Sequence, residues 1–126
     1  MLNKTILIGR LGRDPETRFT NSGQQVTAFS VATDKQYTDK SGEKVKRTIW
    51  MRVSAWGKLA EITAQYLAKG SLVYVEGELT ADENGNPRIW TKTDGTAGSS
   101  FELTAQTVKF LSKVEASAQV EDDEPF

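Results

Sequence analysis

The 126-residue sequence is 37% hydrophobic and 26% charged, an ordinary composition for one globular domain. It contains no cysteine and no histidine, which excludes disulfides, thiolate metal sites and the usual general bases and zinc ligands. No apolar run is long enough to span a bilayer, so we expect no membrane partner. Residues 115–126 hold five acids and no base, which leaves residues 1–114 with a net charge of +4. This asymmetry favours an anionic ligand for the body and a separate task for the tail.

Strand patterns dominate the first half of the chain. A β-branched run that begins at residue 4 is interrupted by Gly9 and Gly12, which is typical of a strand that bends or bulges. The polar segments between the apolar runs contain turn-forming pairs such as Asp14-Pro15, and the second of them carries five bases. Strands are predicted over residues 4–12, 26–33 and 48–56, with loops over 14–25 and 34–47.

One helix is predicted in the second half, within residues 57–70. Its apolar positions recur at three- and four-residue spacing, and Gly70 follows as a left-handed terminator with Lys69 in the last turn. These apolar positions are Leu59, Ile62, Tyr66 and Leu67. Further strands are predicted over 71–79, 88–93 and 100–111, separated by turns at Asn84-Gly85 and Asp94-Gly95.

The order of these elements predicts the fold class. Most consecutive strands have no helix between them, which argues against a parallel βαβ sheet. Three strands, one helix and further strands favour an all-β protein, the OB-fold: a five-stranded Greek-key barrel with a helix between strands three and four. A β-sandwich is the alternative, but the single helix disfavours it. We expect this domain to occupy residues 1–111, and residues 112–126 to form a short disordered linker with an acidic tail.

The third predicted strand carries the main candidate for a binding surface. Alternate residues of a strand share a face, so Ile49, Met51, Val53 and Ala55 form a core face. The opposite face carries Trp50, Arg52, Ser54 and Trp56. A guanidinium between two indoles is poorly suited to a dry core, but it suits an exposed groove in which nucleic-acid bases stack on the indoles. The alternative is that the indoles cover one end of the barrel, with Arg52 above them in a cation–π contact.

Two other aromatic residues lie beside basic ones. Trp90 is flanked by Arg88 and Lys92, and Tyr37 lies in the basic segment 34–47. This interleaving of aromatic and basic side chains on separate segments is typical of a nucleic-acid surface. We assign the remaining large aromatics to packing or loop anchoring: Phe19, Phe29, Phe101 and Phe110.

The sequence contains no complete motif for catalysis or metal binding. Residues 82–86 imitate the start of a calcium loop, but Pro87 stands where glycine is needed and Thr93 where the bidentate glutamate belongs. Glu76 and Glu78 share a strand face without the partners of a catalytic pair. The sequence therefore predicts no enzyme, no catalytic residue, no metal site and no cofactor.

Three segments carry a family resemblance: "LNKTILIGRLGRDPETRFTNSGQQVTAFSVAT" (2–33), "WMRVSAWGKLAEITAQYLAKGSLVYVEGEL" (50–79) and the acidic Pro-Phe tail. Together they resemble the bacterial-type single-stranded DNA-binding proteins, a family that bacteriophages and organelles also carry. The resemblance implies an OB-fold that assembles as a homotetramer and binds single-stranded DNA without sequence preference. It also implies a cytoplasmic, nucleoid-associated protein that protects unwound DNA during replication, recombination and repair.

The resemblance also implies roles for individual residues. The stacking aromatics are Trp50, Trp56, where phenylalanine is more frequent, and Tyr37, where tryptophan is common. Trp90 resembles the stacking aromatic of the family's long hairpin, on which Arg88 also lies, although the sequence of this hairpin departs from the more basic family pattern. The basic contacts are Arg52, Lys58, Lys69 and Lys4. Alternatives for this surface are an RNA or tRNA binder and a protein-interaction module; an OB-fold hydrolase is disfavoured by the absence of histidine and cysteine.

The tail EDDEPF, residues 121–126, is expected to bind other genome-maintenance proteins. In the family the terminal ring enters an apolar pocket, while basic residues of the partner hold the carboxylates. Glu124 stands where the family usually has isoleucine. A solubilising terminus is the alternative to a docking peptide. The residues predicted to bind partners are Asp122, Asp123, Glu124, Pro125 and Phe126.

Overall fold

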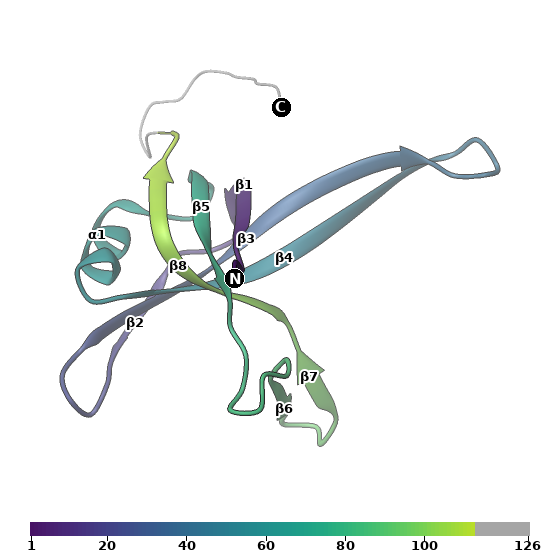
Figure 1. Ribbon diagram of the computed structural model, residues 1–126. Helices are drawn as coiled ribbons and strands as arrows, with labels where there is room; N and C mark the ends of the chain where they lie inside the picture. The colour runs from purple at the N-terminus through teal and green to yellow at the C-terminus, as the bar shows by residue number, and fades with distance from the viewer. Residues whose placement is uncertain (113–126) are drawn as a thin grey trace.

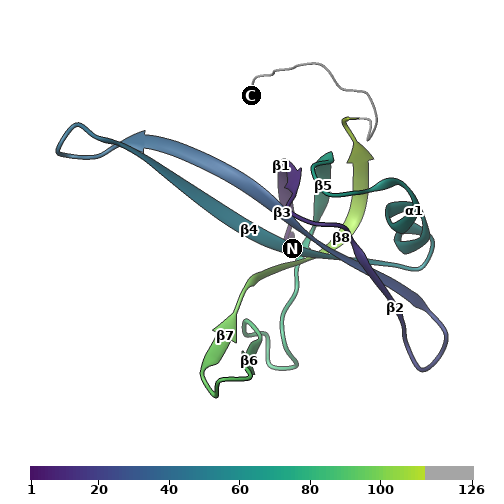
Figure 2. The ribbon, with the colours of Figure 1, turned by 180° about the vertical axis from the view of Figure 1, so that it is seen from behind.

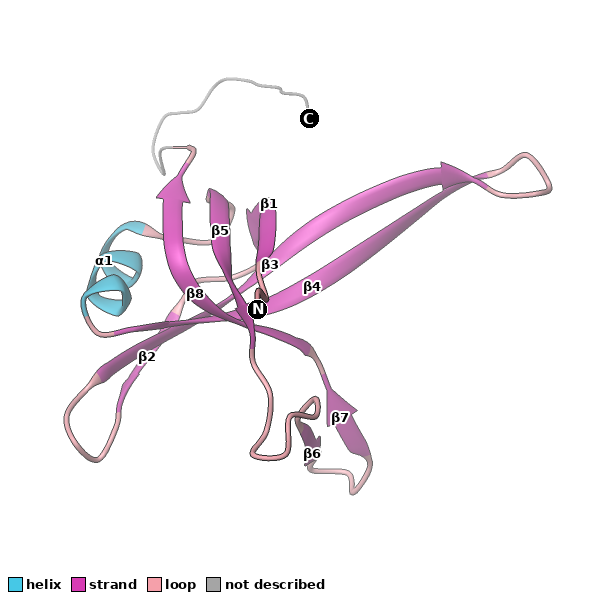
Figure 3. Cartoon of the chain, viewed as in Figure 1, coloured by secondary structure: helices cyan, strands magenta, loops and turns pink. Residues whose placement is uncertain are grey.

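The chain forms a β-barrel with one helix packed at its side (Figure 1). The computed structural model describes residues 1–112, so the predicted tail and its five partner-binding residues lie outside the described part. Figure 3 shows that strands make up most of this part. The elements are β1 (Thr5–Leu11), β2 (Glu16–Phe19), β3 (Gln25–Thr38), β4 (Lys44–Trp56), α1 (Lys58–Tyr66), β5 (Leu72–Leu79), β6 (Ile89–Thr91), β7 (Ala97–Ser99) and β8 (Phe101–Phe110).

Strand pairing closes the barrel. The sheet has the order β1-β5-β8-β4-β3, and β3 returns to β1 through pairs at Arg10–Ala32 and Leu11–Val31. β4 and β8 are parallel, whereas the other pairs are antiparallel. β2 adds to β3 outside the closed barrel. With α1 between the third and fourth barrel strands, this arrangement confirms the predicted OB-fold.

The core follows the alternation of the strands. Val53, Val75 and Leu103 are fully buried and belong to one apolar cluster. On β4 the predicted core face is correct for Met51, Val53 and Ala55 but wrong for Ile49, which is 43% exposed. The reason is that β4 pairs with β8 only from Met51 onward, so Ile49 lies beyond the closed part of the barrel.

The predicted basic loop over residues 34–47 is a long hairpin instead. β3 and β4 remain paired to Thr38 and Lys44, and Figure 1 shows the two strands extending away from the barrel. The Asp39 carboxylate closes the turn by accepting hydrogen bonds from the backbone N–H groups of Ser41 and Glu43. Almost every residue of the hairpin is exposed, so the apolar alternation that marks a half-buried strand is absent from its sequence.

The predicted loop over residues 14–25 contains the short strand β2. Its four residues pair with the start of β3, from Glu16 opposite Ala28 to Phe19 opposite Gln25. All four are exposed, so they carry no burial signal in the sequence. The turn between β2 and β3 contains Gly23 at a φ of 90°, a conformation that favours glycine.

The helix ends earlier than predicted. It stops at Tyr66, and Gly70, at a φ of 90°, belongs to the turn after it, so Lys69 is not in the last helical turn. The helix and the residue that follows it bury Ala60, Thr63 and Leu67, whereas Tyr66 is 54% exposed. The hydroxyl of Thr27 on β3 donates a 2.7 Å hydrogen bond to the Ala60 carbonyl and fixes the helix against the barrel.

Of the four phenylalanines that the sequence assigns to packing or loop anchoring, one is buried. Phe29 is buried as expected, but Phe19, Phe101 and Phe110 are exposed.

The Asp94-Gly95 turn does join two strands, β6 and β7, which form a small hairpin apart from the barrel in both views (Figures 1 and 2). Among residues 1–112, no helix is long and apolar enough to cross a membrane.

Candidate nucleic-acid interface

A groove of about 430 Å³ runs between β4 and the segment that carries β6. Four of the residues that the sequence predicted for binding line it, two from β4 and two from residues 88–90. The groove also contains residues from the β1–β2 connection, β3 and β8. Its lining consists of Arg13, Ser30, Trp50, Arg52, Arg88, Trp90, Ser100 and Glu102.

β4 holds Trp50 and Arg52 above small neighbours. Their partners on β3 are Ala32 and Ser30, and directly opposed residues of an antiparallel pair share a face. A Cβ built on Gly12 would lie 2.6 Å from the Trp50 ring, so the indole rests against bare backbone there. Trp50 nevertheless remains 49% exposed, which leaves indole surface free for a ligand.

The geometry does not support the alternative of a cation–π cap over the barrel end. Trp50 and Trp56 are 49% and 42% exposed, so neither indole is buried as a cap would require. Within residues 1–112 the recorded cation–π contact joins Arg47 and Tyr37, at 5.5 Å, and Arg52 makes none. The outward face of β4 is therefore an open surface.

Trp90 lies on the β6–β7 hairpin with its indole packed over glycine. Its cross-strand partner is Gly98, where a Cβ would lie 2.7 Å from the indole Nε1. Gly98 is buried as a result, although every other residue of the range 81–99 is exposed. Trp90 itself is 43% exposed and borders the same groove as Trp50.

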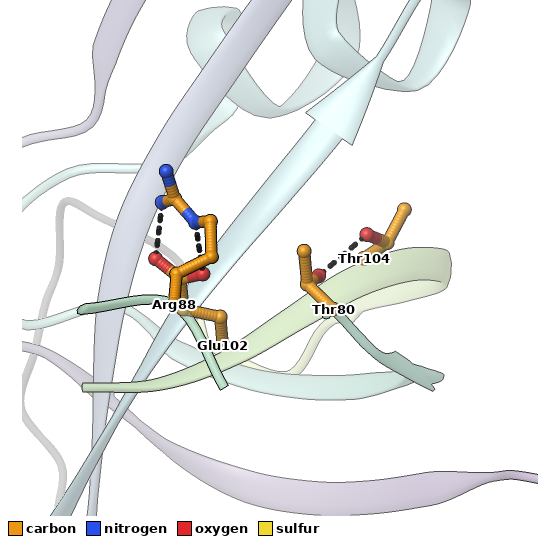
Figure 4. A network of polar contacts seen from close by, with 4 residues as sticks. All are labelled: Thr80, Arg88, Glu102 and Thr104. Atoms are coloured by element: carbon orange, nitrogen blue, oxygen red, sulfur yellow. Dashed lines mark hydrogen bonds and ion pairs between the residues drawn. The ribbon is translucent and has the colours of Figure 1, made fainter. Parts of the chain in front are cut away.

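An ion pair lies at the base of the groove. Arg88 Nε donates a 2.7 Å hydrogen bond to Glu102 Oε1, and Arg88 Nη2 donates a second to Oε2 (Figure 4). The Glu102 side chain is only 7% exposed, whereas that of Arg88 is 55% exposed. The hydrogen bond from Arg88 lowers the pKa of Glu102 against the effect of burial, and the nearby charge of Arg52 adds to the lowering.

A second groove of about 360 Å³ adjoins the first at Arg52. It also contains Thr17 and Arg18 from β2, with Glu16 and Ala28 beside them. Arg18 lies opposite Val26, which in turn lies opposite Trp56, so these three residues form one row across β2, β3 and β4. The outward face thus continues from Trp50 past Arg52 toward Trp56.

The other predicted residues are not gathered in these grooves. Tyr37 lies on the long hairpin, where Arg47 Nη2 donates a 3.0 Å hydrogen bond to its hydroxyl. Lys58 begins α1 and pairs with Glu61 at 3.8 Å. The remaining two lie elsewhere: Lys4 pairs with Glu76 on β5, and the backbone N–H of Lys69 bonds to Asp14. No group of three acidic side chains that could hold a metal ion occurs within residues 1–112.

Comparison with known proteins identifies the family of this chain. The model of the single-strand binding protein family matches residues 2–111, almost the whole described part. The chain belongs to this family. The resemblance found in the sequence is therefore confirmed, and membership in a family of binding proteins also confirms that the chain is not an enzyme.

Relatives of the family carry matching names. The single-stranded DNA-binding protein of Neisseria meningitidis serogroup A is 44% identical over 110 residues, covering 87% of this chain and 60% of the relative. Single-stranded DNA-binding protein 1 of Chlorobaculum tepidum is 56% identical over 78 residues, which is 62% of this chain and 48% of the relative. The chain thus spans about 60% or less of the length of these relatives.

Two solved structures of single-strand binding proteins share the fold. A Plasmodium falciparum SSB complex with ssDNA superposes with a TM-score of 0.71 at 30% identity, over 89% of this chain and 96% of that chain. A deletion mutant of the single-stranded DNA binding protein from Thermus aquaticus gives 0.69 at 31% identity, over 88% and 51%. The strands that carry the two grooves therefore belong to the fold that this chain shares with both proteins.

The sequence did not predict four charged residues of the two grooves: Arg13, Glu16, Arg18 and Glu102. Glu16 and Arg18 lie in the predicted loop over residues 14–25, and Arg13 lies between that loop and the predicted strand over 4–12, so no strand face could be assigned to them. Glu102 is a single acid in an apolar strand, and its position follows only from the parallel pairing of β8 with β4, which sets it opposite Arg52.

The ion pair makes the stability of the fold depend on pH. The pKa of Glu102 is lowered from its ordinary value of 4.5, so the folded chain holds this proton less tightly than the unfolded chain. The stabilisation is therefore fully present above that ordinary value and is lost as the pH falls through the lowered pKa. We expect the melting temperature to fall more steeply below about pH 5 in the wild type than in Glu102→Gln.

Comparing the wild type with Glu102→Gln separates the effect of Glu102 on the pH dependence from the effects of other acids. The pKa values of Asp39 and Asp94 are also lowered, by hydrogen bonds from Ser41 and Thr96, and both variants retain these groups. Thermal melts followed by circular dichroism between about pH 3 and pH 7 provide the measurement. If the melting temperatures of the two proteins fall equally with decreasing pH, the pH dependence does not come from Glu102.

Proposed function

We propose that the chain binds single-stranded DNA without sequence preference through the face of β4 and the groove beside it. The observation that carries the proposal is the presence of two half-exposed indoles, Trp50 and Trp90, along one groove that also contains Arg52. The Plasmodium falciparum structure, which is described as a complex with ssDNA and shares the fold, supports the same ligand.

The physical basis is stacking together with phosphate neutralisation. Every base has a π-face, so stacking on an indole contributes about 1–3 kcal/mol per base whatever the sequence. Arg52 lies where the two grooves meet and supplies a cation to the backbone of a strand that follows the face. A duplex hides its base faces and offers nothing for the indoles to stack on.

Titration of tryptophan fluorescence with oligo(dT) tests this proposal. We expect strong quenching by oligo(dT), little by a matched duplex, and an affinity whose logarithm falls linearly with the logarithm of the salt concentration. The slope is about −0.7 per phosphate neutralised on a single strand, so Arg52→Gln should make it shallower by about that amount. Equal binding of duplex and single strand would contradict the proposal.

The two alternatives give different titrations. An RNA binder of this fold would prefer oligo(U) to oligo(dT) of the same length. A protein-interaction module would ignore both oligonucleotides, and its binding to a partner would depend little on salt. The open groove with two indoles favours base stacking over a protein-interaction module, and the comparison of oligo(dT) with oligo(U) separates DNA from RNA.

For longer strands we propose that contacts extend beyond the main groove. Trp56 continues the β4 face, and Tyr37 offers an aromatic ring beside Arg47 on the long hairpin. Lys4, Lys58 and Lys69 lie at the surface and would meet the backbone of DNA that passes around the barrel. Arg88 borders the groove, but its guanidinium is already paired with Glu102.

We propose that the chain assembles as a homotetramer, as the family resemblance implies. β1 pairs with β5 along its length but with β3 only at Arg10 and Leu11, so one edge of its first half has no strand partner within residues 1–112. Ile6 and Ile8 on this strand are 55% and 38% exposed. An unpaired edge with exposed isoleucines favours association with another copy, which light scattering would measure.

The division of the chain is also a proposal. Residues 1–111 would bind DNA, and residues 112–126 would link the domain to an acidic segment that recruits replication, recombination and repair proteins in the cytoplasm, at the nucleoid. Four acids followed by Pro125 and Phe126 offer charge for encounter and an apolar anchor. Deleting residues 121–126 should abolish recruitment and leave or tighten DNA binding; loss of DNA binding would contradict this division.

A further inference from the structure

We propose that Glu102 is a positioning residue for DNA binding: through Arg88, its carboxylate holds the flap, residues 81–99, so that Trp90 borders the groove shared with Trp50. This inference rests on the proposed function and assigns a role to an acid that lies within an anion-binding surface. Figure 4 shows the ion pair between Arg88 and Glu102.

The flap has few other attachments to the barrel. Its hydrogen bonds within residues 81–99 are internal: Asp82 closes one turn and Asp94 the other, and β6 pairs only with β7. Within residues 1–112, the ion pair from Arg88 to Glu102 is the only recorded side-chain hydrogen bond or salt bridge that joins the flap to a barrel strand. In Figures 1 and 2 the β6–β7 hairpin stands apart from the barrel.

The barrel side of this attachment is rigid. Glu102 lies on β8, and its backbone carbonyl accepts a 3.0 Å hydrogen bond from the N–H of Thr80 at the end of β5. The hydroxyls of Thr80 and Thr104 lie 2.7 Å apart and join the same two strands (Figure 4). The carboxylate is therefore a fixed acceptor, and a bidentate guanidinium fixes both the distance and the orientation of the bound segment.

The pairing also explains why an acid is tolerated in this groove. A buried carboxylate without a partner would be strongly unfavourable and would repel phosphate. Paired with Arg88 it adds no net charge, and the charge of Arg88 is likewise neutralised. Arg88 therefore acts through Glu102 as an anchor for Trp90, two residues further along the chain, rather than as a free cation for phosphate.

The sign of the effect separates positioning from simple charge. If Glu102 only repelled DNA, neutralising it would tighten binding. If Glu102 holds the flap, the same change releases Trp90 and weakens binding, because the stacking of one base is lost or reduced. The two roles therefore give opposite results for Glu102→Gln, a change that keeps the shape of the side chain.

The experiment measures the affinity of the full chain for oligo(dT) at several salt concentrations. We expect Glu102→Gln and Arg88→Gln each to weaken binding by about 5-fold or more, the factor that corresponds to the lower bound for one stacked base. Arg88→Gln should leave the salt slope unchanged, whereas Arg52→Gln makes it shallower. The double variant Arg88→Gln/Glu102→Gln should be no weaker than either single variant, since both remove the same attachment.

A matched control removes another acid from the same face. Glu16 lines the adjoining groove and is exposed, and no ion pair is recorded for it within residues 1–112. We expect Glu16→Gln to tighten oligo(dT) binding slightly, as removal of a negative charge near phosphate should. Opposite effects of Glu16→Gln and Glu102→Gln would show that position, not charge, decides the second.

A measurement without DNA tests the flap directly. In a Trp50→Phe/Trp56→Phe background, Trp90 is the single indole, because the chain has three tryptophans. Adding Glu102→Gln should increase quenching of Trp90 by acrylamide and lower its fluorescence anisotropy, while the circular dichroism spectrum stays that of the folded barrel. If Glu102→Gln loses the folded spectrum, the same quenching and anisotropy measurements are made on Arg88→Gln, which changes an exposed side chain.

The outcomes are distinct. Weaker binding together with greater quenching of Trp90 supports the inference. Tighter binding by Glu102→Gln, or unchanged binding and quenching in both variants, overturns it. If the wild-type chain does not bind oligo(dT), the proposed function fails, and the quenching of Trp90 still decides whether Glu102 holds the flap.

Discussion

Replacement of Trp50 by alanine should weaken binding to oligo(dT) by about 5- to 150-fold, which corresponds to roughly 1–3 kcal/mol for one stacked base. Trp50 is placed for this role by two features. Its neighbours, Ala32 on β3 and Gly12 just after β1, are small, so the indole lies on the surface instead of in the core, and half of it stays exposed. It also borders the groove that contains Trp90 and Arg52. The affinity is measured by anisotropy of a labelled oligonucleotide, which does not depend on tryptophan emission.

Tyr66→Ala is the matched control for this change. Tyr66 is also a large exposed aromatic residue, but it lies on α1 against Phe110, with ring centroids 5.9 Å apart, and lines neither groove. Its removal should leave the affinity for oligo(dT) within about 2-fold of the wild type, because the loss of one exposed ring away from the grooves removes no stacking. If Trp50→Ala behaves like Tyr66→Ala, β4 is not the stacking surface.

The face of β4 could be predicted from the sequence because its alternation is strict where the barrel is closed. Met51, Val53 and Ala55 are buried, and the residues between them point outward, as a period of two requires. The alternation therefore places Trp50 and Arg52 on the outward face of the strand. The signal failed at Ile49, where the strand continues beyond the barrel and neither face is covered.

Other parts could not be predicted because their stability does not come from local apolar pattern. β2 and the long hairpin are held by backbone pairing with the neighbouring strand across a turn, and their side chains are exposed. The attachment of the flap depends on Arg88 and Glu102, which are fourteen residues apart in the sequence and meet because the β6–β7 hairpin, which pairs Ile89 with Ser99, returns the chain to the start of β8. Backbone pairing between exposed strands and a single ion pair leave no apolar periodicity in the sequence.

The second large effect concerns stability: Gly9→Ala should destabilise the fold by about 3 kcal/mol or more, at the upper end for overpacking. Gly9 is buried on β1, next to the residues through which β1 leaves β5 and pairs with β3 to close the barrel. A Cβ at this position would lie 2.1 Å from the Ala32 carbonyl oxygen and 2.8 Å from Val31 Cγ1. Backbone cannot rotate away as a side chain can, so β1 must move and the closure of the barrel is lost.

Gly12→Ala makes the same chemical change three residues later with a different expected result. A Cβ there meets only ring carbons of Trp50, at 2.6 Å, and the indole can swing outward. We therefore expect Gly12→Ala to lower oligo(dT) affinity while its melting temperature stays near that of the wild type. Gly9→Ala should lower the melting temperature by on the order of 10 °C or more. Thermal melts and titrations of both variants separate the two roles: a Gly9→Ala protein that melts like the wild type would show that β1 does not pass so close to β3. The single methyl group thus tests closure of the barrel at one glycine and placement of the stacking indole at the other.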